Sequence, residues 1–306
     1  MFDHQTRVAQ QEEAPAPMPS ARLNTGAQIP CLGFGTYLTN GAELLEALLV
    51  AFRLGYRHID TAAGYMNEAV VAEAMVESGL RRDSCYVTTK LWCDSHGTER
   101  TRVAIADSLR RLQTDYVDLY LIHAPDNQGE SESEIRRLRR ESWLVMEEAH
   151  RAGKLRAIGV SNFEPHHIEA LLRNDDGTPR AGAIVPAVNQ FELHPYFDQA
   201  ATREYCESMN IVVVAYGSLQ AGGLLRDPVV VRMARAYGRT PAQISLRHTL
   251  QRGAVVLARS SSPVHLEENA RVFEFRLEAD DEAALLELAA TRGGDERNYW
   301  DNSDVP

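Results

Sequence analysis

One stretch of the chain organises the rest, and it reads His58-Ile59-Asp60-Thr61-Ala62-Ala63-Gly64-Tyr65-Met66-Asn67-Glu68. The apolar run over residues 56–62 predicts a buried strand, which breaks at Gly64 before a helical pattern begins. Asp60 is therefore expected at the end of a buried strand, with the Tyr65 phenol in the following loop. Burying a carboxylate is costly unless a partner offsets it. Taken alone, the pattern favours a capping Asp and a surface Tyr. Only residues further along the chain indicate a catalytic role for these two side chains.

Strand-length apolar runs and amphipathic stretches alternate on both sides of this segment. The predicted strands cover residues 33–37, 58–62, 86–91, 117–123, 157–160, 186–193, 211–216 and 254–258. The predicted helices cover residues 42–54, 68–78, 98–112, 133–151, 165–173, 198–209, 229–237 and 263–273. Strand-then-helix units of this size, repeated about eight times, are typical of an α/β (β/α)8 TIM barrel.

Segments outside the repeated units complete this prediction. Residues 1–21 are polar and predict a loosely ordered leader, and residues 22–306 predict one barrel domain. The run 22–30, with a turn at Thr25-Gly26, predicts a β-hairpin ahead of the barrel. Residues 241–252 and 279–291 predict two further helices. The tail that follows carries Tyr299 and Trp300, and we expect it to form a loop over the active-site mouth.

A two-domain, doubly wound fold is the alternative for a chain of 306 residues. That fold requires a Gly-x-Gly-x-x-Gly pattern after an early strand, at the start of a helix. The nearest match, Gly33-Phe34-Gly35, lacks the third glycine and does not open a helix. The barrel is therefore the preferred interpretation.

The composition excludes several classes of partner. A formal charge of −11 argues against nucleic acid and anionic membrane. No apolar run approaches the roughly 20 residues of a membrane span, and the N-terminal residues lack the apolar core of a signal peptide. The 4 cysteines show neither disulfide nor metal-site spacing. We therefore expect a cytoplasmic protein without a metal ion, and a monomer because nothing requires an oligomer.

Four polar side chains follow three successive predicted strands. Asp60 ends the second strand, with Tyr65 in its loop, Lys90 ends the third strand and His123 ends the fourth. Active sites of (β/α)8 barrels lie where the strands end, so these side chains should meet at one rim. An ammonium beside a phenol lowers the phenol's pKa from its ordinary value of about 10. Lys90, oriented by Asp60, would make Tyr65 a general acid toward a carbonyl oxygen that His123 positions. No electron source is present, so a bound cofactor must supply the hydride.

Five motifs resemble those of the aldo-keto reductase family in order and spacing, over residues 23 to about 277. They are Asp60-Thr-Ala-x-x-Tyr65-x-Asn-Glu68, Thr89-Lys90-Leu-Trp92, Leu119-Tyr-Leu-Ile-His123, Gly159-Val-Ser-Asn-Phe163 and Asn189-Gln-Phe-Glu-Leu-His-Pro-Tyr196. The resemblance implies an oxidoreductase that transfers hydride from NADPH to an aldehyde or ketone. It also implies Tyr65 as the general acid, in a tetrad with Asp60, Lys90 and His123.

The same resemblance implies a cofactor site. Ser161, Asn162 and Gln190 would bind the nicotinamide carboxamide, and Tyr216 would stack on the ring, which suits amide and aromatic side chains. The other implied cofactor-binding positions are Thr36, Ser218, Leu219, Arg259, Ser260, Ser262, His265, Glu268 and Asn269.

Two departures from the family pattern bear on the choice between NADPH and NADH. Arg259 stands in place of a Lys and keeps a permanent charge near a helix N-terminus, which suits a phosphate. His265 stands in place of an Arg and is largely neutral at pH 7. Losing a charged contact worth roughly 1.5–3 kcal/mol predicts NADPH with discrimination against NADH weakened about tenfold or more. The alternative is that His265 is only a helix-surface residue.

The expected substrate pocket comprises Tyr37, Trp92, Ala124, Tyr299 and Trp300. Ala124 replaces an indole that is common in the family, which predicts a larger pocket. Two other functions remain as alternatives: a non-catalytic regulatory or sensor protein that binds a nicotinamide cofactor, and a Schiff-base aldolase that uses the Lys90 amine. The sequence does not identify the carbonyl substrate.

Overall fold

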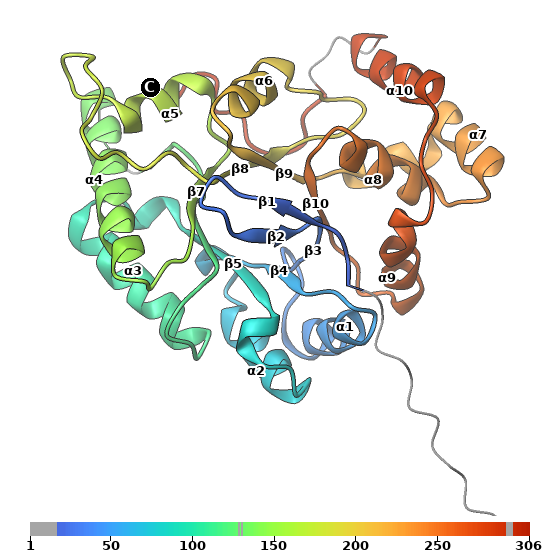
Figure 1. Ribbon diagram of the computed structural model, residues 1–306, viewed down its shortest axis with the longest axis horizontal. Helices are drawn as coiled ribbons and strands as arrows, with labels where there is room; N and C mark the ends of the chain where they lie inside the picture. Colours follow the sequence, from blue (N-terminus) through green and yellow to red (C-terminus); the bar gives the residue numbers. More distant parts are fainter. Residues whose placement is uncertain (1–16, 128, 130, 292–295) are drawn as a thin grey trace, which may run out of the picture.

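Parallel strands close into a barrel in the computed structural model, which describes residues 17–127, 129, 131–291 and 296–306 (Figure 1). Closure occurs where the last strand pairs with the first, with Val256 beside Leu32. Within the described residues the eight barrel strands are β3 (Leu32–Gly35), β4 (His58–Asp60), β5 (Tyr86–Leu91), β6 (Leu119–Ile122), β7 (Ile158–Ser161), β8 (Val188–Glu192), β9 (Val212–Tyr216) and β10 (Val255–Ala258). The predicted (β/α)8 barrel is confirmed.

Helices surround the barrel on its outside (Figure 1). The α-helices are α1 (Gly41–Arg53), α2 (Glu68–Glu77), α3 (Thr98–Arg111), α4 (Glu132–Arg151), α5 (Pro165–Leu172), α6 (Ala200–Ser208), α7 (Pro228–Tyr237), α8 (Pro241–Gln251), α9 (Pro263–Ala270) and α10 (Ala279–Thr291). The short 3-10 turns are η1 (Ala63–Tyr65), η2 (Arg82–Ser84), η3 (Cys93–Ser95), η4 (Gln220–Gly222), η5 (Leu224–Arg226) and η6 (Arg271–Phe273). None of the described helices has the length and apolar character needed to cross a membrane.

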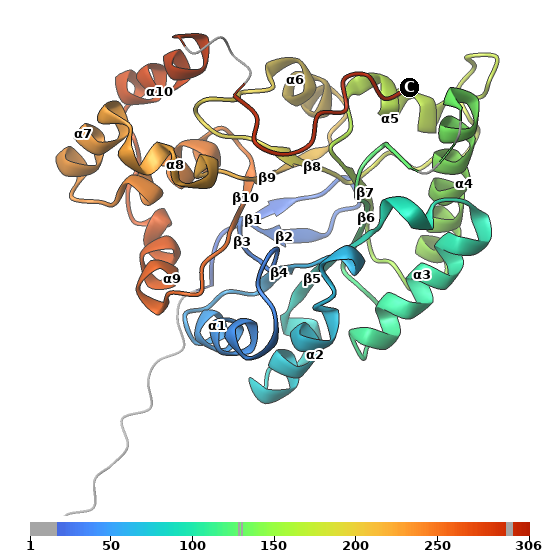
Figure 2. The same ribbon diagram turned by 180° about the vertical axis from the view of Figure 1, so that it is seen from behind.

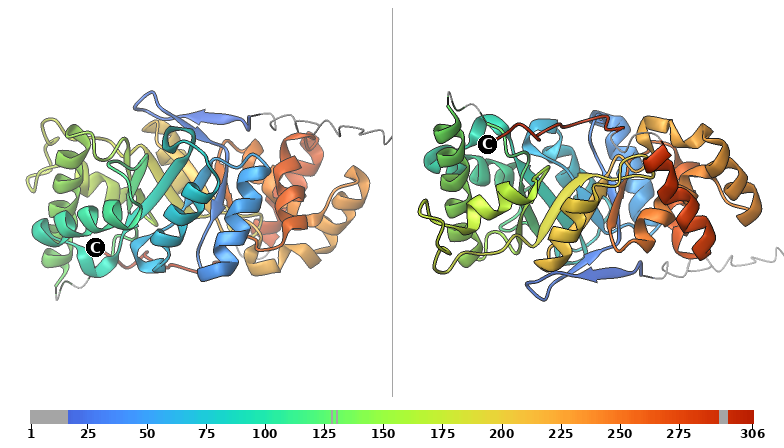
Figure 3. Two further views of the ribbon diagram at one scale, coloured as in Figure 1. Left: turned by 90° about the horizontal axis from the view of Figure 1, so that it is seen from below. Right: turned by 90° about the horizontal axis from the view of Figure 1, so that it is seen from above.

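The N-terminal hairpin covers the barrel end at which the strands begin (Figures 1 and 3). Its strands β1 (Ser20–Arg22) and β2 (Gln28–Pro30) pair antiparallel. Leu23 and Ile29 are buried and pack with side chains of the barrel interior. The predicted hairpin is thus confirmed, and its apolar side chains close this end of the barrel. Of the predicted leader, residues 1–16 lie outside the described residues, and β1 takes in the last two.

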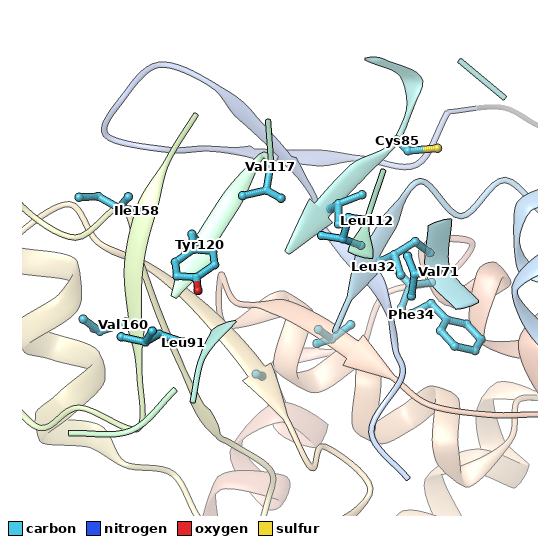
Figure 4. Close-up of a cluster of buried hydrophobic side chains, with 14 of the residues drawn as sticks. Leu32, Phe34, Val71, Cys85, Leu91, Leu112, Val117, Tyr120, Ile158 and Val160 are labelled. Atoms are coloured by element: carbon cyan, nitrogen blue, oxygen red, sulfur yellow. The ribbon is translucent and has the colours of Figure 1, made fainter. Parts of the chain in front are cut away.

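Two layers of apolar side chains form the core, because successive residues of a strand point to opposite faces. On β6, Leu119 and Leu121 belong to the cluster inside the barrel. Their neighbours Tyr120 and Ile122 belong to the larger cluster between strands and helices, part of which Figure 4 shows. The strands end one or two residues earlier than predicted at several places. Thr36 and Tyr37, for example, follow β3 and belong to its loop.

A buried carboxylate ties the loop before β8 to α4. Glu147 is 1% exposed and accepts hydrogen bonds from Arg180 Nη1 at 2.9 Å and Nη2 at 2.5 Å. The backbone N–H of Ile184 donates to the same carboxylate at 2.9 Å. This bidentate pair offsets the cost of burying the charge and holds the chain that enters β8.

The C-terminal tail, residues 296–306, crosses the barrel end opposite the hairpin (Figures 2 and 3). In Figure 2 its dark red trace passes over the ends of β8 and β9 and finishes beside α5. The predicted loop over the mouth is therefore present. It lies at the carboxyl ends of the strands, where (β/α)8 barrels carry their functional residues.

Candidate active site

A cavity of about 260 Å³ opens at the carboxyl ends of the strands, beneath the tail. It brings together most of the side chains that the sequence singled out: Tyr37, Asp60, Tyr65, Trp92, His123, Ser161, Asn162, Gln190, Tyr216, Ser218, Leu219, Arg259, Tyr299 and Trp300. Six further lining residues, which are small or apolar, were not among the predicted site residues: Gly35, Gly217, Ala221, Gly222, Leu257 and Ala258.

Lys90 lies at the centre of a buried hydrogen-bonded group. Its ammonium donates to Asp60 Oδ1 at 2.5 Å and to the Thr61 carbonyl at 2.9 Å. The Tyr65 hydroxyl lies 3.4 Å from the same nitrogen. Lys90 is fully buried and Asp60 is 3% exposed, so this ion pair is shielded from water. The tetrad predicted from the sequence thus meets at one point, although its residues come from three strands and a loop.

The loop after β4 presents Tyr65 through a tight 3-10 turn, η1. The next two motif residues hold that turn in place. Asn67 accepts from Thr61 Oγ1 at 2.6 Å and donates to the carbonyls of Thr36 and Thr39. Glu68 is buried and accepts from Thr89 Oγ1 at 2.6 Å. Both residues therefore support the position of the phenol.

The electrostatics of Tyr65 differ from the sequence prediction. Burial, followed by the charge of Asp60, raises the pKa of Tyr65 well above 10.0. The prediction of a lowered Tyr65 pKa is therefore wrong. Burial disfavours a phenolate, and the Asp60 carboxylate, which pairs with Lys90, opposes the effect of the ammonium on the phenol. Tyr65 is therefore a protonated phenol at neutral pH, and it can donate a proton.

His123 faces the cavity as a neutral imidazole. Burial, and after it the Lys90 ammonium, lowers its pKa well below 6.5. Its ring centroid lies 5.5 Å from that of Tyr65 and 4.9 Å from that of Trp92. Its Nδ1 is buried and has no hydrogen-bond partner among the described residues. A neutral ring of this kind can donate one hydrogen bond to an oxygen bound beside Tyr65.

Gln190 has a second task that the sequence did not indicate. Its Nε2 donates to Asp60 Oδ2 at 2.7 Å, so it holds the carboxylate that holds Lys90. Asn162 is held as well, because it donates to the His123 carbonyl at 2.8 Å and accepts from the Tyr216 hydroxyl at 2.6 Å. Ser161 Oγ donates to the Gln190 carbonyl at 2.7 Å. The residues expected at the nicotinamide are thus linked directly to the tetrad.

Polar atoms without partners mark the remainder of the expected cofactor site. Ser218 Oγ and Asn269 Oδ1 are both buried, and neither has a hydrogen-bond partner within the described part of the chain. Arg259 and His265 are exposed. Ser262 is the N-cap residue before α9, but its side chain makes no capping hydrogen bond, and the first turn of that helix contains no acidic residue. Such a helix N-terminus favours an anion, so these residues fit a dinucleotide.

Several predicted residues do not line the cavity. Thr36 is fully buried, and its hydroxyl donates to Asn67 Oδ1 at 3.4 Å. Ala124 is also fully buried and is not a lining residue, so the predicted enlargement of the pocket at this position has no support. The Trp300 ring instead lies 5.9 Å from the His123 ring. Lys90 is not a lining residue either and lies buried on β5. The remaining predicted positions outside this lining lie at or near α9: Ser260, Ser262, His265, Glu268 and Asn269.

Comparison with known proteins identifies the family. A family model described as Aldo/keto reductase family matches residues 31–290. The chain belongs to the aldo/keto reductase family. The family comprises oxidoreductases that act on small carbonyl compounds with a nicotinamide cofactor, and this protein is an oxidoreductase of that class.

Relatives of this aldo/keto reductase come from distant organisms. Glyoxal reductase of Bacillus subtilis is 38% identical over 86% of this chain and 90% of its own length. Estradiol 17 beta-dehydrogenase 5 of Mus musculus is 38% identical over 88% of this chain and 91% of its own length. A crystal structure of an aldo/keto reductase from Brucella melitensis is 37% identical and superposes with a TM-score of 0.80, covering 89% of this chain and 99% of that one.

Glycine at position 64 shapes this aldo/keto reductase's pocket in a way that the sequence motifs did not reveal. A Cβ atom added at Gly64 would lie 2.3 Å from Trp92 Cε3. The glycine therefore lets the indole pack directly on the loop that presents Tyr65. Trp92 in turn lies at right angles to His123 and near Trp300, with ring centroids 4.9 and 6.2 Å away.

No group of His, Cys, Asp and Glu side chains suited to a metal ion occurs among the residues described.

Proposed function

We propose that this aldo/keto reductase reduces an aldehyde or ketone to an alcohol with NADPH as the hydride donor and Tyr65 as the general acid. The observation that carries the proposal is the buried contact of the Tyr65 hydroxyl with Lys90, whose ammonium is paired with Asp60. A cavity lined by His123 and by aromatic side chains lies at this contact.

Proton donation follows from the state of the phenol. Because its pKa lies well above 10.0, Tyr65 keeps its proton across the neutral range. When a carbonyl carbon is reduced, its oxygen becomes an alkoxide and takes the proton from Tyr65. The Lys90 ammonium stabilises the tyrosinate that remains, and the neutral His123 donates a hydrogen bond that orients the oxygen. A bound reduced nicotinamide supplies the hydride.

The environment of Lys90 disfavours a Schiff-base mechanism. That mechanism requires a neutral amine that can attack a carbonyl. All three hydrogens of the Lys90 ammonium already have acceptors, in Asp60, Thr61 and Tyr65. The nitrogen is also fully buried beneath the cavity floor. Lys90 therefore suits a role through Tyr65 rather than one as a nucleophile.

NADPH is preferred over NADH in this proposal because of Arg259. Its exposed guanidinium lines the cavity and donates to the Tyr37 carbonyl at 3.3 Å. The helix α9 begins a few residues later in the chain with an uncapped N-terminus, and each of these groups favours a phosphate. His265 lies in the first turn of the same helix and contributes no permanent charge. We therefore infer weaker discrimination between the two cofactors than an Arg at position 265 would give.

The test of the proposed reaction is oxidation of NADPH by the purified protein with a generic aldehyde. Tyr65→Phe should lower the rate by about 100-fold or more while leaving NADPH binding within a few-fold. Tyr116→Phe is a matched control, because the Tyr116 hydroxyl is buried without a partner among the described residues. Cofactor binding without turnover in the wild type would favour the sensor alternative, and full activity of Tyr65→Phe would refute the assigned acid.

His265→Arg tests the cofactor preference separately. Adding a guanidinium should raise the ratio of kcat/KM for NADPH over NADH about tenfold. An unchanged ratio would mean that residue 265 does not reach the phosphate.

A further inference from the structure

We propose that Glu192 is a positioning residue that fixes the substrate-side wall of the cavity and joins it to the loop at residues 217–223, here called the strap. It does so by holding the tail residues Asn298 and Tyr299 through their N–H groups. The substrate and cofactor readouts below rest on the proposed function, whereas the contact between Glu192 and the tail does not.

The carboxylate of Glu192 ends β8 and is 2% exposed. Oε1 accepts from the backbone N–H of Asn298 at 3.0 Å and from its side-chain Nδ2 at 3.1 Å. Oε2 accepts from the N–H groups of Asn298 and Tyr299 at 3.0 and 3.1 Å. His194 Nε2 lies 3.0 Å from Oε1. A buried carboxylate needs such donors, and most of them come from a segment more than 100 residues away in sequence.

Two aromatic walls of the cavity depend on this contact. Tyr299 and Trp300 follow the held backbone directly, and both line the cavity. The Trp300 ring lies 5.9 Å from that of His123, and the Tyr299 ring lies 5.5 Å from that of Tyr216. If the tail left Glu192, both rings would move away from the position that a bound carbonyl compound contacts.

The strap packs against Glu192 and against the tail residues that Glu192 holds. Gly217 has a φ of +67°, and a Cβ added there would lie 3.2 Å from Tyr299 Cε2 and 3.3 Å from Glu192 Cγ. Gln220 Nε2 donates to Asn298 Oδ1 at 3.4 Å. The tail, the carboxylate and the strap therefore form one packed unit. Because Ser218 and Leu219 of the strap are implied cofactor contacts, loosening the tail should weaken cofactor binding as well as the substrate wall.

The far end of the tail has separate anchors. Asn302 Nδ2 donates to the Asn162 carbonyl at 3.2 Å. His167 Nε2 lies 2.7 Å from the Val305 carbonyl, and Arg139 Nη2 donates to the Pro306 carbonyl at 2.6 Å. Losing the Glu192 contact should therefore release residues 298–301 while the barrel and the end of the tail stay in place.

Amide hydrogen exchange on the cofactor-free protein tests the contact itself. Glu192→Gln removes the charge, and Asn298→Asp places a second carboxylate against the first. Each should speed exchange of the residue 298 and 299 amides about tenfold or more. The double variant should recover part of the protection, since the new amide can donate to the new carboxylate. Glu204→Gln, exposed on α6, is the control and should change nothing.

Steady-state kinetics and cofactor binding test the effect of the Glu192 contact on the substrate wall and on the strap. In both single variants KM for a naphthaldehyde should rise about tenfold, while kcat for propionaldehyde stays within about twofold. The Kd of NADPH, measured by quenching of protein fluorescence, should rise about threefold or more. Unchanged exchange in both single variants would overturn the proposal, as would faster exchange with unchanged KM and Kd. A wild-type protein that reduces neither aldehyde would refute the proposed function, and the exchange and Kd measurements would still decide the role of Glu192.

Discussion

The ion pair between Lys90 and Asp60 can be tested by taking away one charge at a time. Lys90→Met removes the ammonium and keeps most of the side-chain volume. Asp60 would then be a carboxylate that is 3% exposed and keeps the Gln190 hydrogen bond at 2.7 Å but no counter-ion. Asp60→Asn combined with Lys90→Met removes both charges and leaves no unpaired ion.

The size of the expected loss of stability in Lys90→Met follows from the burial of the ion pair. Removing one partner of a buried ion pair costs about 3–5 kcal/mol, because the other charge is left uncompensated. A domain of this size loses roughly 2–4 °C of Tm for each kcal/mol, so Lys90→Met should unfold about 6–20 °C below wild type. The double variant should recover to within about 1.5 kcal/mol, since replacing a whole buried pair is often nearly neutral.

Two assays separate stability from activity. Urea unfolding followed by fluorescence gives the free energy of unfolding, and NADPH oxidation with an aldehyde gives the rate. Both variants should lose at least about 100-fold in rate, so the double variant should be stable yet inactive. A Lys90→Met protein as stable as wild type, or a double variant no more stable than the single, would refute the claim that Asp60 is a buried charge held by Lys90.

Three further predictions concern other parts of the chain. Burial raises the pKa of Glu147, but its guanidinium partner and a backbone N–H outweigh this and hold it below the ordinary 4.5. The contribution of Glu147 to the free energy of unfolding is therefore present above pH 4.5 and is lost as the pH falls through the lowered pKa. Glu147→Gln should cost about 3 kcal/mol at pH 7 in urea unfolding, a difference that shrinks in acid, whereas the exposed control Glu148→Gln should cost under about 0.5 kcal/mol. Gly64→Ala should displace the indole of Trp92 and lower kcat/KM for an aromatic aldehyde about tenfold, with partial recovery on adding Trp92→Phe; an unchanged kcat/KM would contradict the contact. Because the pKa of Tyr65 is raised well above 10.0, the phenol stays protonated as the pH rises toward that value, and deprotonation of Tyr65 should not lower kcat/KM for reduction below pH 10.0. A pH profile in which kcat/KM falls through loss of this proton below pH 10.0 would contradict the raised pKa.

The sequence by itself determined the barrel and the rim at which the chemistry lies. Alternating strand and helix patterns leave little choice of architecture, and polar residues at the ends of buried strands must meet at one mouth. Asp60, Lys90 and His123 were found in this way because strand order fixes their neighbours whatever the loops do. Tyr65 was found because it follows Asp60 by five residues in a short turn.

Only the tertiary structure decided the contacts between distant segments. Gln190 supports Asp60 across 130 residues, and Glu192 holds the tail across 106. Trp300 from the tail, rather than position 124, supplies a second indole beside His123, in addition to that of Trp92. The pKa of Tyr65 is raised rather than lowered because its burial depends on how all of these segments close over it. No local pattern encodes such effects, since they depend on the distance between side chains that only the completed fold brings together.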